Sequence, residues 1–300
     1  IGRGKYLPRK EVTSKALGKR FDASDEYIYK VCGINSRWYC EGTENLETMA
    51  YNASINAINN GKIKNDDIDL IIVATTSSPK MMPGISYTVQ SLLKIEDCIC
   101  MDILGGCNGF VNAFDIAYNY IAIGKVNTAL VIGVDRLSTA IDKNDMSTTI
   151  LFGDGAGATI ITKSSEKKEY YSKLKSRGQE SEYLTYEVGR KLRMDGTNIY
   201  KYAVTEVPKI INETLEMANL EIDDLKHIIL HQSNIRIMNS IAKKLGIYKG
   251  RLYANIENVG NTFCASIPIA LAEIDIQDGE YLLMCGYGGG LNTGCIILEA

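Results

Sequence analysis

The chain lacks the features that would suggest a membrane or a nucleic acid as its partner. No stretch of about twenty apolar residues occurs, so the sequence predicts no transmembrane helix. The formal net charge is only -3, with acidic and basic residues interspersed, which gives no argument for binding nucleic acid or an anionic surface. Only five prolines occur and low-complexity tracts are absent, so no disordered linker is expected. Residues 1–8 do not resemble a signal peptide and are expected to be the end of a strand.

Metal-ligating residues are also scarce. The chain has two histidines, and none of its eight cysteines forms a Cys-x-x-Cys motif. Cys98 and Cys100 are two positions apart, but no second pair or nearby histidine completes a zinc site. We therefore expect no metal and no permanently bound cofactor. Free thiols persist in reducing compartments, so the cysteines favour a cytoplasmic protein.

An internal repeat predicts the architecture. The chain has 300 residues, of which 45% are hydrophobic, enough for one large domain or two fused ones. Three kinds of segment recur: 66–77 matches 223–234, 153–162 matches 286–298, and the helix 108–123 corresponds to the helix 262–273. We predict an α/β fold of two pseudo-symmetric halves, 1–162 and 163–300. In such a duplication, sites form where strand ends and helix N-termini of the two halves meet.

Apolar periodicity and turn residues place the elements within these halves. Helices are expected at 25–30, 44–60, 86–93, 108–123, 202–218, 234–245 and 266–272, and strands at 67–74, 99–104, 128–134, 158–162, 227–230, 281–285 and 295–298. The glycine-rich segments 152–157 and 286–294 are expected to be loops. The polar interval 163–200 is expected to be a crossover that carries substrate-channel or lid residues.

Cys107 is the candidate nucleophile. It lies between the predicted strand 99–104 and the predicted helix 108–123, behind two glycines that leave room for a substrate. A helix N-terminus offers unpaired N–H groups and the positive end of the helix dipole, which favour a thiolate. The alternative is that Cys107 is a small buried hydrophobic residue, as many cysteines are.

Two further polar residues are expected to face Cys107. The repeat aligns Cys107 with the turn 260–263, which places Asn261 opposite it, and His231 directly follows the strand 227–230. Imidazole and amide groups can donate hydrogen bonds to a developing oxyanion, and the glycines at 286–290 can add backbone N–H groups. Taken singly, His231 could be a hydrogen-bonded core residue and Asn261 a helix cap. His227, at the start of its strand, is expected to be structural.

With these motifs the chain resembles the 3-oxoacyl-[acyl-carrier-protein] synthase III family of the thiolase-like superfamily, over essentially its whole length. The segments that carry the resemblance are 6–8 (YLP), 106–110 (GCNGF), 152–158 (FGDGAGA), 231–236 (HQSNIR), 260–262 (GNT) and 288–290 (GGG). The resemblance implies a thiolase-like fold, with duplicated α/β/α/β/α layers. It also implies an acyltransferase that takes an acyl group from acyl-CoA or an acyl-carrier protein and condenses it with malonyl-carrier protein in fatty-acid or related acyl-chain synthesis.

The resemblance also implies roles for residues. Cys107 would carry the acyl group, while His231 and Asn261 would stabilise the enolate formed as CO2 leaves. The backbone N–H groups of Cys107 and Gly289 would form an oxyanion hole, and Arg236 would dock the acidic carrier protein. Residues matching the substrate and pantetheine site are Tyr27, Phe152, Met194, Gly196, Thr197 and Asn234. Met82 matches a residue that reaches into the partner's acyl pocket, which implies a homodimer; alternatively, it is an ordinary surface-loop methionine.

The chain departs from the family pattern where coenzyme A is usually held. Tyr27, Val31 and Met146 stand where a Trp and two Arg are usual. A Tyr can still stack on adenine, but Val31 and Met146 cannot pair with phosphate, at a cost of roughly 1.5–3 kcal/mol per charged hydrogen bond. Thr197 replaces a usual Asn and Gly106 a more common Ala. We therefore predict a primer other than acetyl-CoA, used in a specialised pathway.

The sequence is also compatible with other activities. An acyltransferase on the same fold would pass the acyl group to an alcohol or amine, and a silent ketosynthase partner would catalyse nothing. The intact Cys107 argues against the silent partner, and the pair of donors, His231 and Asn261, favours condensation. A cysteine protease also uses Cys, His and Asn, but its cysteine normally lies near the mature N-terminus.

Overall fold

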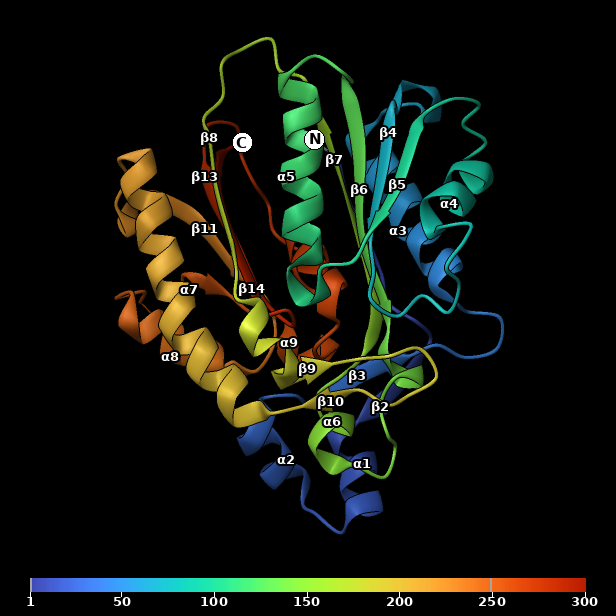
Figure 1. The fold of residues 1–300 in the computed structure, drawn as a ribbon, viewed down its shortest axis with the longest axis vertical. Helices are drawn as coiled ribbons and strands as arrows, with labels where there is room; N and C mark the ends of the chain where they lie inside the picture. The colour runs from blue at the N-terminus through green and yellow to red at the C-terminus, as the bar shows by residue number, and fades with distance from the viewer. Residues whose placement is uncertain (1, 249) are drawn as a thin grey trace.

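The fold consists of two five-stranded sheets with helices between and outside them. In this computed structural model, residues 2–248 and 250–300 are described, so the expected strand at the N-terminus is described from residue 2. Figure 1 shows the layers, with α5 (Gly109–Ala122) between the two sheets and further helices on the outer face of each. This α/β/α/β/α arrangement confirms the thiolase-like fold class that the sequence predicts.

The first sheet takes all its strands from residues 2–162. Its order is β1-β7-β6-β4-β5, with bounds β1 Gly2–Tyr6, β4 Leu70–Ala74, β5 Ile99–Ile103, β6 Thr128–Arg136 and β7 Asp154–Thr162. The strand β4 is parallel to β5 and β6, and β7 is antiparallel to β6 and β1. Every residue of β4 is buried, as expected for a central parallel strand covered on both faces.

The second sheet takes its strands from residues 170–299 and repeats this plan. Its order is β12-β11-β13-β14-β8, with bounds β8 Tyr170–Ser176, β11 Leu225–Leu230, β12 Leu252–Tyr253, β13 Tyr281–Gly288 and β14 Asn292–Glu299. The central β11 is parallel to β12 and β13, and the β13–β14 hairpin is antiparallel. The carboxyl ends of β4 and β11 therefore mark equivalent points of the two sheets.

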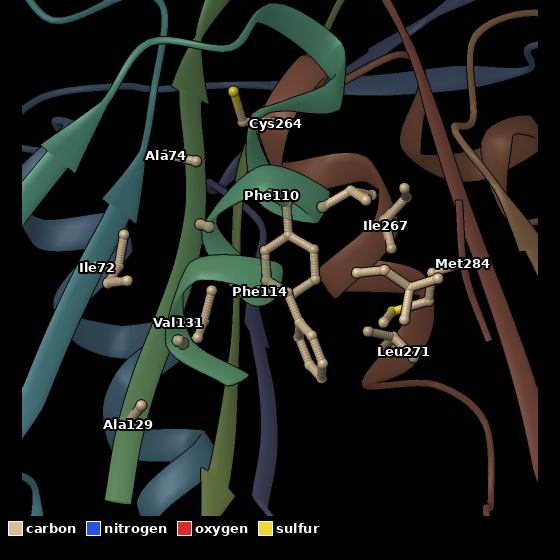
Figure 2. Close-up of a cluster of buried hydrophobic side chains, with 14 of the residues drawn as sticks. Ile72, Ala74, Phe110, Phe114, Ala129, Val131, Cys264, Ile267, Leu271 and Met284 are labelled. Carbon is tan, nitrogen blue, oxygen red and sulfur yellow. The ribbon is translucent and has the colours of Figure 1, made fainter. Parts of the chain in front are cut away.

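Three apolar clusters hold the layers together. The central one packs α5 and α10 (Ser266–Leu271) between the sheets, and Figure 2 shows Phe110 and Phe114 of α5 beside Ile267 and Leu271 of α10. Outside the first sheet lie α3 (Leu46–Gly61) and α4 (Ile85–Leu93). Outside the second sheet lie α7 (Gly196–Ala218) and α8 (Ile235–Lys244). Burial on both faces of each sheet explains the nearly uninterrupted apolar runs in the sequence.

The remaining elements are short and cover one end of the layers (Figure 1). They are β2 Lys10–Thr13, α1 Ser14–Phe21, α2 Asp25–Cys32, β3 Ser36–Tyr39, α6 Met146–Thr149, β9 Leu184–Thr185, β10 Arg193–Met194 and α9 Ile256–Val259. The start of α2 follows the predicted signal, because the Ser24 side chain accepts a hydrogen bond from the Tyr27 backbone N–H. Across the described ranges, no helix combines the length and the apolar character that crossing a bilayer requires.

The structure corrects three of the predicted segments. The glycine-rich stretch 152–157 is not a loop, because β7 already begins at Asp154. Its glycines serve packing: a Cβ on Gly157 would lie 2.5 Å from backbone atoms of Pro268 and Ile269 in α10. The stretch 286–294 is likewise mostly strand, since β13 runs to Gly288 and β14 begins at Asn292.

The interval 163–200 is corrected in part: Leu184, Met194 and Gly196 do line a pocket that contains Cys107, as expected of substrate-channel residues, but the interval is not merely a crossover. It contains β8, the edge strand of the second sheet, as well as β9, β10 and the start of α7. The residues of β8 are half-buried or exposed, so the strand lacks the apolar run that identifies central strands. Its position comes from pairing with β14 over the whole strand.

Candidate active site

A pocket of about 100 Å³ brings together residues from both halves of the chain. Cys107, His231 and Asn261 all line it. The two halves of the chain are joined beside it, because the Gly153 N–H donates to the Asn261 carbonyl and the Asn261 N–H donates to the Leu151 carbonyl, both at 2.9 Å. The convergence that the repeat predicts for these three side chains is therefore observed.

Cys107 lies in the turn between β5 and α5. This turn, Gly106–Asn108, is a short 3₁₀ helix that runs directly into α5. Gly106 adopts a φ of 53°, a left-handed conformation that favours glycine. The β13–β14 hairpin approaches so closely that a Cβ on Gly288 would lie 2.9 Å from the Cys107 sulfur. These two glycines let the backbone pass on either side of the nucleophile.

The thiol of Cys107 is protonated at neutral pH rather than ionised. Burial raises its pKa, and the nearby Asp135 carboxylate raises it further. The backbone N–H groups of Cys107 and Gly289 oppose this shift but do not outweigh it. The pocket therefore does not favour the thiolate expected at this turn, because burial and the Asp135 carboxylate raise the pKa more than the two backbone N–H groups lower it.

His231 follows β11 and is held as a neutral imidazole. Its Nδ1 lies 2.6 Å from the Ser266 hydroxyl oxygen, which leaves Nε2 as the ring nitrogen for a ligand in the pocket. Complete burial lowers its pKa to about 3. The ring of Tyr287 meets the imidazole edge to face at 5.4 Å between centroids. His227, in contrast, lies within β11 and contacts Glu280 at 2.8 Å, as expected of a structural residue.

Asn261 has a fixed amide. Its Oδ1 accepts the Phe263 backbone N–H at 3.1 Å, and its Nδ2 donates to the Ser233 carbonyl at 3.4 Å. The second hydrogen on Nδ2 is left for a molecule in the pocket. Since the donor orientation is set by two protein contacts, Asn261 can support an oxyanion without reorganising.

Asp135 lies beneath the site and was not found from the sequence. It ends the apolar run of β6, is fully buried, and accepts hydrogen bonds from Ser77 and from the Cys264 backbone N–H. The Cys264 thiol in turn donates to the Gly106 carbonyl at 2.8 Å. Asp135 therefore connects the turn that carries Cys107 with the turn that carries Asn261. The sequence feature that could have indicated it is an acidic residue at the end of an otherwise apolar strand.

The other residues named from the sequence divide into two groups. Four line the pocket: Phe152, Met194, Gly196 and Asn234. Four are exposed outside it: Tyr27, Met82, Thr197 and Arg236. Arg236 lies in the first turn of α8, and its backbone N–H is capped by the Asn234 side chain at 2.8 Å. The positions that depart from the family pattern, Val31 and Met146, pack in the same apolar cluster as Cys107 and Phe152.

Ser233, Ser266 and Tyr287 also belong to the site, although no sequence pattern by itself singles them out. Ser233 and Tyr287 line the pocket, and Ser266 holds His231. Ser233 lies within the motif 231–236, two residues after His231, and this position could have indicated that it belongs to the site. Within residues 2–248 and 250–300, no cluster of three or more His, Cys, Asp or Glu side chains is arranged to hold a metal ion.

Comparison with known proteins places this chain in a family. The model of the family described as 3-oxoacyl-[acyl-carrier-protein (ACP)] synthase III matches residues 101–178, and that of its C-terminal part matches residues 215–300. The chain is 38% identical to the beta-ketoacyl-[acyl-carrier-protein] synthase III of Aquifex aeolicus, covering 100% of this chain and 98% of the relative. It is 36% identical to the enzyme of the same name from Clostridium acetobutylicum, covering 100% and 97%.

Solved structures agree with the sequence relatives. The crystal structure of the Aquifex aeolicus 3-oxoacyl-[acyl-carrier-protein] synthase III superimposes with a TM-score of 0.97, covering 100% of this chain and 99% of that one. A priming β-ketosynthase of the R1128 polyketide pathway superimposes with a TM-score of 0.94 at 30% identity, covering 99% of this chain and 95% of that one. On the combined evidence of sequence, fold and pocket, the chain belongs to the 3-oxoacyl-[acyl-carrier-protein] synthase III family of thiolase-like condensing enzymes.

Proposed function

We propose that the chain is a decarboxylating ketosynthase in which Cys107, His231 and Asn261 carry the reaction. The observation that supports this assignment is their convergence in one pocket, from turns that follow β5, β11 and α9. The reaction has two half-reactions, acyl transfer to the cysteine and condensation with a malonyl thioester.

In the first half-reaction the Cys107 sulfur attacks the carbonyl carbon of an acyl thioester. A carbon–sulfur bond forms to Cys107, the bond to the donor thiol breaks, and the thiol proton of Cys107 leaves with the donor thiol. The backbone N–H groups of Cys107 and Gly289, which already act on the Cys107 sulfur, donate to the tetrahedral oxyanion.

In the second half-reaction a malonyl thioester loses CO2. The electron pair of the breaking carbon–carbon bond moves onto the thioester oxygen, where His231 Nε2–H and Asn261 Nδ2–H donate to the resulting enolate. The enolate carbon then attacks the acyl-cysteine. The new carbon–carbon bond gives a 3-oxoacyl thioester, and Cys107 leaves as a thiolate that takes up a proton.

A neutral histidine suits this second step. With a pKa of about 3, His231 remains uncharged throughout the physiological range. A neutral N–H donor does not give its proton to the enolate as readily as an imidazolium would, so the carbanion survives to attack the acyl group. The contact between Nδ1 and the Ser266 hydroxyl keeps the ring orientation constant.

The substrates are thioesters carried on a phosphopantetheine arm. Phe152, Met194, Gly196 and Asn234 line the pocket and would contact the arm. Tyr27 is 53% exposed, so its ring is free to stack on an adenine or to contact a carrier protein. Exposed Arg236, beside the pocket residue Asn234, would dock an acidic carrier protein, and Thr197, exposed in the first turn of α7, would contact the arm.

The primer is an acyl thioester other than acetyl-CoA. Val31 and Met146 pack in the apolar cluster that includes Phe152 and Met194, and neither side chain can bind a phosphate. A donor held on a carrier protein does not need phosphate contacts at these positions. This favours a carrier-bound or longer primer, used in a specialised pathway.

A homodimer is supported by an exposed apolar edge. The strand β5 is the edge of the first sheet, and Leu104, directly after it, is 81% exposed. Met81 and Met82 are 91% and 84% exposed. The loop that carries them is tied to β5 because the Ile85 N–H donates to the Asp102 carboxylate at 2.7 Å. A second copy of the chain is the occupant proposed for this edge, with Met82 entering its acyl pocket.

Two further proposals concern organisation and location. The halves 1–162 and 163–300 are the two units of the duplication, since each supplies one sheet. The eight cysteines are all free in the described structure, which favours the reducing cytoplasm.

The test is to separate the two half-reactions. Intact-protein mass is measured after incubation with a panel of acyl-CoAs and acyl-carrier proteins, with Cys107→Ala as the control. CO2 release from a malonyl thioester is then measured on the acylated enzyme. Acylation of Cys107 followed by CO2 release supports a ketosynthase. Acylation followed only by transfer to an alcohol or amine would identify an acyltransferase, and absence of acylation would identify a silent partner.

A further inference from the structure

Ser233 and Tyr287 form a pair of hydroxyl groups that the proposed reaction does not yet use. The Tyr287 hydroxyl and the Ser233 Oγ are 2.6 Å apart. Both residues line the active-site pocket, where Tyr287 is 1% exposed and Ser233 is 8% exposed. The pair is therefore a hydrogen bond within the wall that surrounds Cys107.

A count of donors leaves one O–H without an acceptor. Each hydroxyl brings one proton, and the hydrogen bond between the two groups uses only one of them. Neither hydroxyl has another hydrogen-bond acceptor in the described part of the chain. Because a phenol is the stronger donor and Tyr287 is the deeper of the two, Tyr287 donates and the Ser233 proton is the one left over. An O–H donor without an acceptor is unfavourable in a buried wall, so a group in the pocket is expected to accept it.

The position of Ser233 identifies that group. Its backbone N–H donates to the His231 carbonyl at 2.9 Å, and its carbonyl accepts the Asn261 amide at 3.4 Å. The backbone of Ser233 thus contacts both residues that are assigned to the enolate. Its side chain lines the same pocket as their two donor groups.

We propose that the Ser233 hydroxyl is a third hydrogen-bond donor to the thioester oxygen of the condensing substrate, with Tyr287 holding it in place. Negative charge collects on this oxygen as CO2 leaves, so a donor aimed there acts on decarboxylation. Acyl transfer to Cys107 uses the N–H groups of Cys107 and Gly289 instead, and does not depend on Ser233. The inference rests on the proposed condensation reaction and adds a residue to it.

The test compares Ser233→Ala, Tyr287→Phe and the double variant in both half-reactions. We expect Ser233→Ala to lower kcat for CO2 release about tenfold or more, with KM for the malonyl thioester changed less than about threefold. Tyr287→Phe should lower kcat less, because the serine donor remains but is no longer oriented. The double variant should match Ser233→Ala, and the rate of Cys107 acylation should stay at the wild-type value in all three.

A matched control is available elsewhere in the chain. Tyr202 and Thr293 form another buried hydroxyl pair, 2.7 Å apart, which does not line the pocket. Tyr202→Phe should therefore leave both half-reactions unchanged. This control shows whether an effect comes from losing any buried hydroxyl pair or specifically from losing the pair that lines the pocket.

Three results would overturn the assignment. They are an unchanged kcat in Ser233→Ala, a rise in KM alone, or a parallel loss of acylation and CO2 release. The second would place Ser233 in binding of the pantetheine arm, and the third would make it a structural residue. If the wild-type enzyme itself releases no CO2 after acylation, the proposed condensation is wrong and this inference fails with it. That outcome differs from the other three because it is seen without any substitution.

Discussion

The substitution Asp135→Asn tests whether this buried carboxylate connects the two halves of the site. Oδ1 accepts from Thr75, Thr76 and Ser77, while Oδ2 accepts the Cys264 N–H at 3.0 Å. An asparagine has a single oxygen, so one side of this network must lose its acceptor. If the side-chain oxygen of the variant takes the place of Oδ1 beside Ser77, the amide N–H₂ takes the place of Oδ2. It then faces the Cys264 N–H, which loses its acceptor.

The cost follows from that unpaired donor. A buried donor left without a partner lowers the free energy of unfolding by about 1–3 kcal/mol. Part of this loss is offset because the variant no longer buries a charge. The Cys264 turn should then move away from the Gly106 carbonyl, so catalysis should fall along with stability. In addition, loss of the negative charge removes one of the two causes that raise the pKa of Cys107. Alkylation of Cys107 should therefore proceed at lower pH in the variant.

The assay combines urea unfolding with iodoacetamide alkylation of Cys107 across a pH series, followed by mass spectrometry. Asp69→Asn is a matched control, because Asp69 also accepts two backbone N–H groups, those of Asn127 and Thr128, but next to the amino end of β4. The control should lose stability without moving the alkylation profile. An unmoved profile in Asp135→Asn, or an equal movement in Asp69→Asn, would refute the electrostatic part of the reasoning. Unchanged stability would refute the structural part.

Four other outcomes are expected. In Gly288→Ala the new methyl group would lie 2.9 Å from the Cys107 sulfur, so acylation measured by intact mass should fall at least tenfold with an unchanged circular dichroism spectrum. Because the pKa of His231 is about 3, the rate constant for CO2 release by the acylated enzyme should not titrate with His231 between pH 7.5 and 5. A CO2-release rate that titrates near pH 6.5 would contradict the argument that burial keeps His231 neutral. The free energy of unfolding should nevertheless decrease as pH falls below about 6.5, because His231 takes up a proton in the unfolded chain but not in the folded one. Arg236→Glu should raise KM for an acidic carrier protein about tenfold while KM for a small pantetheine thioester stays the same, and equal effects on both would place Arg236 outside the docking surface.

Much of the architecture was predictable because its signals are local. Uninterrupted apolar runs marked the central strands β4 and β6, and side-chain caps marked helix starts such as Ser24. The internal repeat predicted that Asn261 and His231 would meet Cys107, and all three line one pocket. A duplication is readable from sequence because both copies bury equivalent faces and so retain the same pattern.

The errors arose where the environment of a residue is supplied by distant segments. The glycines at 152–157 predicted a loop, yet they form a strand because α10 leaves no room for a side chain at Gly157. The edge strand β8 has no apolar signature, and only its pairing with β14 defines it. The contact between Ser233 and Tyr287 joins positions 54 apart in the chain, which no local pattern indicates.

The chain by itself indicated which residues form the candidate site. Cys107 and His231 each lie between a strand and a helix, and Asn261 lies in the turn before α10. Only the tertiary structure decided their ionisation. A helix N-terminus favours a thiolate, but complete burial and Asp135 keep Cys107 protonated, and burial keeps His231 neutral. The physical reason is that desolvation depends on all the atoms packed around a group, whereas a motif records only the neighbours along the chain.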